Sequence, residues 1–158
     1  MGVAFSPDGS RLATTDWSGS LDLWDPNTGK MIGAPIPDPG QQVTNSVAWS
    51  PDGRTIAVTD WSNTLRLFDI ATRHELGPPI PLGNPNGDTT NPYATFTPDG
   101  AKVIVSDDTG QVWIIPVSLK AWEDRACQIA GRNLTHAEWQ QFVTGHGYAN
   151  TCPQFPAD

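Results

Sequence analysis

The sequence predicts an all-β repeat fold followed by a short helical tail. The stretch VAFSPDGSRLATTDWSGSLDLWD at residues 3–25 returns as VAWSPDGRTIAVTDWSNTLRLFD at residues 47–69, and a weaker copy, ATFTPDGAKVIVSDDTGQVWIIP, begins at residue 94. The 15 Gly and 15 Pro among 158 residues suit many short strands better than long helices. After residue 117 the apolar period changes from two to about 3.6, which indicates helices.

Each copy has the same internal order of segments. A short apolar segment leads into Ser/Thr-Pro-Asp-Gly, in which Pro sets φ and Asp and Gly complete a tight turn. A β-prone run and a second turn follow, and then a strand alternates, with Leu21 and Leu23 on one face and Asp22 on the other. The fourth segment ends in IGAPIP or LGPPIP, and its prolines suit an outer sheet edge. Four short antiparallel strands in about 45 residues are typical of a propeller blade.

The copies resemble the WD40 repeat family. Trp24-Asp25 matches the dipeptide that names the family, whereas the second copy has Phe68-Asp69 and the third has Ile115-Pro116. The resemblance covers about residues 1–117. It implies a partial WD40-type β-propeller of about three four-stranded antiparallel blades, at about residues 1–40, 41–85 and 86–117, with the first and last incomplete.

Three blades are fewer than a closed ring contains, because propellers typically have four to eight. A blade buries its faces against its neighbours, so a partial ring leaves faces uncovered. We therefore expect the chain to be the C-terminal portion of a longer propeller, whose missing blades would be its neighbours. The alternative is a homodimer, in which two copies close a six-bladed ring.

Residues 118–158 are predicted to form a helical hairpin that packs on the last blade. An apolar stripe indicates the first helix, with Gly131 as its stop; the stripe comprises Leu119, Trp122, Ala126 and Ile129. Thr135 and Glu138 have the spacing of a capping box for a second helix, and Trp139, Phe142 and Val143 are its expected buried stripe. The two cysteines, Cys127 and Cys152, are expected to be neighbours, while the sequence leaves open whether they are bonded.

The tail segment ACQIAGRNLTHAEWQQFV, with the later YANTCP, resembles the end of large bacterial WD40-repeat proteins. In such proteins the propeller often follows an NTPase or protein-kinase domain. The resemblance therefore implies a bacterial protein, and it leaves open a sensory end-domain that regulates such a linked domain.

Composition excludes several classes of partner. The net charge is −8, and the nine Lys and Arg are scattered singly, which argues against nucleic-acid binding. No apolar run is long enough to cross a bilayer, and the N-terminus shows no secretory leader. We therefore expect no membrane association and a cytoplasmic location.

The sequence contains no pattern typical of an enzyme. His74, His136 and His146 are isolated, and neither a nucleophile elbow nor a phosphate-binding loop is present. The predicted innermost strands are mainly apolar, which disfavours a propeller hydrolase or lyase with a site in the central channel. We expect no catalysis, no cofactor and no metal site.

One repeated turn is the candidate for partner binding. Thr-Asp-Trp-Ser occurs with Asp16 and Trp17 in the first copy and with Asp60 and Trp61 in the second, and Asp107-Asp108 takes this place in the third. Aromatic rings beside carboxylates would suit an Arg- or Lys-bearing peptide. The alternative is that each Trp packs across the gap between blades. The sequence thus favours a non-catalytic scaffold that binds other proteins or peptides through Asp16, Trp17, Asp60, Trp61, Asp107 and Asp108.

Overall fold

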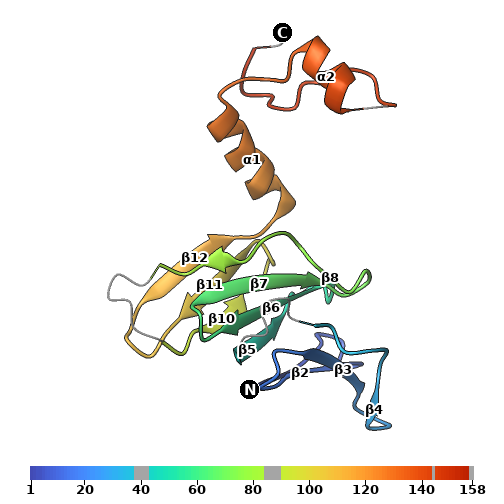
Figure 1. Ribbon diagram of the computed structural model, residues 1–158, viewed down its shortest axis with the longest axis vertical. Coiled ribbons are helices and arrows are strands. Elements are labelled where there is room, and N and C mark those ends of the chain that lie inside the picture. Colours follow the sequence, from blue (N-terminus) through green and yellow to red (C-terminus); the bar gives the residue numbers. More distant parts are fainter. Residues whose placement is uncertain (38–42, 84–89, 144, 157–158) are drawn as a thin grey trace. The chain divides into compact units, whose positions relative to one another are not determined.

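The computed structural model describes residues 1–37, 43–83, 90–143 and 145–156 (Figure 1). The chain divides into two compact units, Met1–Ile115 and Pro116–Asp158. The first unit contains three antiparallel sheets and the second contains two helices. The expected blade boundaries, after residues 40 and 85, lie outside the described residues.

Strand order in each sheet follows the chain, as in a propeller blade. The first sheet comprises β1 (Gly2–Phe5), β2 (Leu12–Thr15), β3 (Leu21–Asp25) and β4 (Lys30–Met31). The second comprises β5 (Thr44–Trp49), β6 (Thr55–Asp60), β7 (Thr64–Asp69) and β8 (His74–Glu75), with β9 (Ile80–Pro81) also on β7. The third comprises β10 (Tyr93–Phe96), β11 (Lys102–Ser106) and β12 (Val112–Pro116). The predicted fold class, a partial β-propeller with a helical tail, is confirmed.

The outer strand of the second blade is divided into two pieces. β8 pairs with one end of β7 at Phe68–Glu75, and β9 pairs with the other end at Leu65–Ile80. In the first blade a single bridge between Leu21 and Ile36 replaces β9. Prolines in the IGAPIP and LGPPIP segments lack the N–H that a continuous ladder needs, which explains the interruption.

The first and second blades share one hydrophobic core. Its buried residues are Ala13, Leu21, Leu23 and Ile36 from the first blade and Val47, Trp49, Ile56, Val58, Phe68 and Ile70 from the second. The Trp49 indole N–H donates to the Ala4 carbonyl at 3.0 Å, which joins the innermost strands of the two blades. A Cβ at Gly2 would lie 2.8 Å from the Val47 nitrogen, so these strands approach too closely for a side chain there.

The first and third blades each expose a residue whose counterpart in the middle blade is buried. Val112 of the third blade is 61% exposed, whereas its counterpart Leu65 in the middle blade is 0% exposed. Val3 of the first blade is 67% exposed, whereas its counterpart Val47 is 8% exposed. Only the middle blade therefore has a neighbouring blade on both faces within the described residues.

The uncovered face of the third blade also differs in its residue sizes. At the close contact between the first two blades, the first blade presents Ala4 and Ala13, with Gly2 at the tightest point. The third blade has Thr95 and Ile104 at the positions of the two alanines and Tyr93 at the position of the glycine. These larger side chains would obstruct a further blade that packed in the same way.

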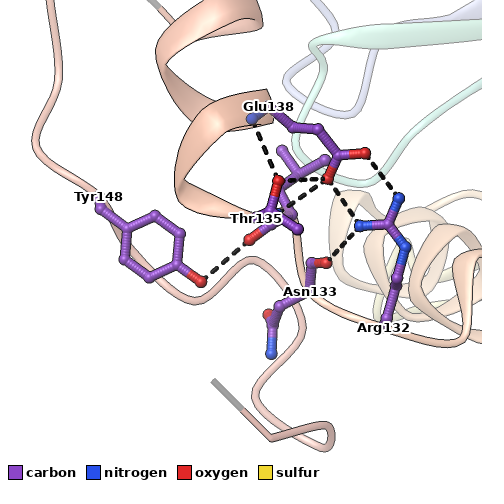
Figure 2. Close-up of polar contacts among 6 residues, drawn as sticks. Arg132, Asn133, Thr135, Glu138 and Tyr148 are labelled. Atoms are coloured by element: carbon purple, nitrogen blue, oxygen red, sulfur yellow. Dashed lines mark hydrogen bonds and ion pairs between the residues drawn. The ribbon is translucent and has the colours of Figure 1, made fainter. Parts of the chain in front are cut away.

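The tail unit contains α1 (Leu119–Ala130) and α2 (His136–Phe142). α1 ends where Gly131 adopts φ 68°, as the sequence predicts. The predicted capping box is also present, because the Thr135 hydroxyl accepts from the Glu138 N–H and the Glu138 carboxylate accepts from the Thr135 N–H. Figure 2 shows that the same carboxylate also accepts two hydrogen bonds from Arg132.

A disulfide and a buried amide hold the rest of the tail together. Cys127 and Cys152 are joined by a disulfide. Asn133 accepts from the Cys152 N–H, and its amide nitrogen donates to the carbonyls of Phe155 and Pro156. The expectation that Phe142 is buried is wrong, since its side chain is 69% exposed and this short helix buries no residue fully. The expected packing of the tail on the last blade stays a prediction.

Candidate protein-interaction surface

The Asp of each repeated turn organises its own backbone. In the first blade, Asp16 Oδ1 accepts from the Ser18 N–H at 2.8 Å, from the Ser18 hydroxyl at 2.6 Å and from the Ser20 N–H at 3.3 Å. This is an Asx turn, closed by Gly19 with φ 81°. The hydrogen bonds from Ser18 lower the pKa of the Asp16 carboxyl, so it is ionised at neutral pH.

The turn geometry exposes the tryptophan that follows each Asp. Trp17 is 62% exposed and Trp61 is 42% exposed. The two indoles meet edge to face, with ring centroids 5.8 Å apart and planes at 72°. The structure thus brings together two residues that are 44 positions apart in the sequence. Packing between the blades and contact with a partner are compatible roles for these side chains, because the rings pack against each other and still present apolar surface to solvent.

Two hydrogen bonds from the segment that enters the second blade support the Trp17–Trp61 pair. The Thr44 hydroxyl on β5 donates to the Asp16 carbonyl at 3.1 Å. The Trp61 N–H donates to the Val43 carbonyl at 3.0 Å. The segment that enters the second blade is therefore tied to both turns, which fixes the relative position of the two rings.

The counterpart of Asp16 in the second blade, Asp60, is buried at 1% exposure. Its Oδ1 accepts from the N–H groups of Ser62 and Thr64, and its Oδ2 lies 3.6 Å from Arg66 Nε. Arg66 is itself buried and donates to both carboxylate oxygens of Glu75. The Asp60 charge is therefore compensated inside the protein and is not presented to a partner.

The first blade has an acid where the second has this arginine. Asp22 occupies the repeat position of Arg66, and no ion pair involves Asp16 or Asp22 among the described residues. Burial raises the pKa of Asp22, the Ser20 hydroxyl partly offsets this, and the charge of Asp16 raises it further. One buried oxygen of Asp22, Oδ1, has no hydrogen-bond partner in the described chain. The edge of the first blade therefore carries uncompensated negative charge.

The third blade keeps the turn without the aromatic ring. Asp107 Oδ1 accepts from the N–H groups of Thr109 and Gln111. Burial opposes ionisation of Asp107, but the hydrogen bonds from Thr109 and Gln111 outweigh it and lower the pKa. Asp108 is exposed, and its carboxylate accepts from the Asn91 backbone and side-chain N–H groups. The Asp107 carboxylate therefore holds its own turn, and the Asp108 carboxylate holds the segment that enters the blade at Asn91.

Sequence reasoning did not identify Arg66 and Asp22 as part of this region. Both occupy the polar position of an alternating strand, which by itself indicates a solvated face. The signal that could have identified them is the exchange of charge between equivalent positions, because one repeat has Arg and the other has Asp beside the same turn.

The described chain shows no feature of a metal centre or a membrane span. No group of three or more His, Cys, Asp or Glu within residues 1–37, 43–83, 90–143 and 145–156 is placed to hold a metal ion. Neither helix in these ranges has the length and apolar character that crossing a bilayer requires.

Comparison with known proteins matches the first two repeats. The WD40 family model (WD domain, G-beta repeat) matches residues 1–25 and 38–69. The matches support the WD40 resemblance for these blades, and WD40 repeats generally mediate protein–protein interaction and are typically non-catalytic scaffolds. The search of curated proteins found no relative of this chain.

Proposed function

We propose that this chain is a non-catalytic scaffold module that binds proteins or peptides at the edge where the turns of the first two blades meet. The observation that carries the proposal is the exposed Trp17–Trp61 pair. Tryptophan is among the residues enriched in the centres of protein interfaces, because it buries a large area at a low cost in side-chain entropy.

The hydrogen bonds that hold the two rings in place also favour the proposal. A partner that binds two exposed rings gains most when the rings are already fixed, since fewer rotamers are lost on binding. The contacts of Thr44 with Asp16 and of Val43 with Trp61 supply that preorganisation. The other tryptophans of the first two blades are engaged internally, since the Trp24 indole donates to the Thr14 hydroxyl and the Trp49 indole to the Ala4 carbonyl.

A displayed library of random peptides, selected on the 158-residue chain, tests this proposal. We expect binders whose affinity falls by about tenfold or more in Trp17→Ala or Trp61→Ala, since interface tryptophans often contribute about 2 kcal/mol when truncated. Trp122→Ala is the matched control, because it removes a partly exposed indole from the tail unit. Selected peptides that bind both turn variants as tightly as the original chain would refute the proposal.

A further inference from the structure

We propose that the partner places an arginine side chain at Asp16 and Asp22, beside the Trp17–Trp61 pair. This inference rests on the proposed function and names the chemistry that the surface recognises. Its basis is the difference between two equivalent turns, one of which contains an arginine of its own.

The second blade shows what this turn looks like when a cation is present. Asp60 has Arg66 within 3.6 Å, and Arg66 is held in turn by Glu75. The arginine is the third residue of β7, six positions after the Asp. The turn motif and the strand register are the same in the first blade, where Thr15 pairs with Leu21 as Thr59 pairs with Leu65.

The first blade lacks the cation and has added a negative charge in its place. Asp22 stands at the position of Arg66, so its carboxyl group lies in the electrostatic field of the Asp16 carboxylate. Neither group forms an ion pair within the described chain. One Asp22 oxygen is buried without a partner. A cation bound from outside beside the two carboxyl groups would relieve the repulsion between them.

The aromatic pair selects arginine over other cations. A guanidinium is planar, so it can stack on an indole face while its edge donates hydrogen bonds to a carboxylate. A lysine ammonium is a compact and strongly hydrated point charge that cannot make both contacts in this way. The chain's net charge of −8 further favours the approach of a basic segment.

The first test uses three matched peptides of Gly and Ser with one central residue, which is arginine, lysine or citrulline. Binding is followed by NMR through the indole N–H signals of Trp17 and Trp61, assigned with Trp17→Phe and Trp61→Phe. We expect the arginine peptide to shift both signals, the lysine peptide to bind more weakly, and the neutral citrulline peptide to shift neither. Equal shifts with arginine and citrulline, or no shift with any peptide, would overturn the inference.

Two variants test the acidic half of the site. Asp16→Asn keeps the oxygen that organises the turn but removes the charge, and we expect roughly tenfold weaker binding of the arginine peptide. Asp22→Arg gives the first blade the residue that the second blade has, and we expect it to abolish binding and to raise the thermal unfolding temperature. Glu123→Arg is the control, because it makes the same change of charge in the tail unit. Unchanged binding in Asp22→Arg would contradict the inference.

The outcomes separate this inference from the proposed function. Library peptides that depend on Trp17 and Trp61 but contain no arginine would leave the interaction surface standing and refute the arginine. Peptides that bind without either tryptophan would refute both.

Discussion

Removing the disulfide between Cys127 and Cys152 should unfold the tail unit while leaving the blades intact. The bond closes a loop with a sequence separation of 25 residues. On the loop-entropy model a loop of this length stabilises the folded state by about 3.5 kcal/mol. A unit of the size of Pro116–Asp158 has a total stability of roughly 2–6 kcal/mol at typical values per residue. The loss is therefore comparable with everything that holds the tail together.

Some of the remaining interactions of the tail also depend on the disulfide. Asn133 contributes three hydrogen bonds, each with a net value of about 1 kcal/mol, and two of them bind a segment near residue 155 that the disulfide also restrains. Asn133 is buried at 5% exposure, so its amide would need to be resolvated as the segment separates.

Hydrogen exchange followed by mass spectrometry measures this effect in each unit separately. The double variant Cys127→Ala/Cys152→Ala and the chain in a thiol reductant should both lose amide protection in α1 and α2. β5, β6 and β7 should exchange as in the oxidised chain and serve as the internal control. Unchanged protection of the helices after reduction would show that packing alone supports the tail, and it would refute the argument from loop entropy.

Three further predictions concern the blades. Hydrogen bonds lower the pKa of Asp8 to about 2 and also lower the pKa of Asp52 and Asp99. The stability that these carboxylates supply is therefore present above pH 4 and should be lost as the pH falls towards 2. Circular dichroism during an acid titration measures this loss, and a flat signal down to pH 2 would contradict it. Arg66→Ala leaves Asp60 and Glu75 without their buried cation and should lower the free energy of urea unfolding by about 3–5 kcal/mol. The exposed control Arg11→Ala should lower it by less than about 0.5 kcal/mol. Equal effects of the two variants would refute the buried network. Light scattering should give a monomer mass near 17.0 kDa, because Tyr93, Thr95 and Ile104 obstruct the packing of a second copy on the third blade. The triple variant Tyr93→Ser/Thr95→Ala/Ile104→Ala should favour the pairing of two copies. A dimer of the original chain would contradict the argument.

Local features of the fold could be predicted from the sequence because local residues determine them. Ser-Pro-Asp-Gly specifies its turn without help from other blades, as Gly9 and Gly53 show by adopting φ 70° and 69°. The end of α1 at Gly131 and the capping box at Thr135 are likewise settled within a few residues. Alternation on β3 and β7 then follows, since each turn sets the register of the strand after it.

Features that depend on neighbouring blades could not be predicted in this way. Periodicity places Arg66 on a polar face, but that face of the middle blade is covered by the first blade, so Arg66 is buried. The contact of Trp17 with Trp61 depends on the distance between two blades, which no repeat contains on its own. The division of the outer strand into β8 and β9 shows a similar limit, because prolines indicate an edge without indicating where pairing resumes.

The recurrence of a residue in a repeat is evidence for structure, and the exceptions to recurrence are evidence for function. Asp16, Asp60 and Asp107 each accept hydrogen bonds from the backbone of their own turn, so their presence in all three copies needs no partner to explain it. What differs is the residue six positions later, which is Asp22 in the first blade, Arg66 in the second and Trp113 in the third. In the second blade the arginine at this position lies 3.6 Å from the turn Asp and compensates its charge. The first blade has an acid instead, and it is the blade whose turn carries the most exposed tryptophan. The surplus negative charge on β3 therefore follows directly after the turn that carries the exposed ring, as expected if a partner rather than the fold supplies the missing cation.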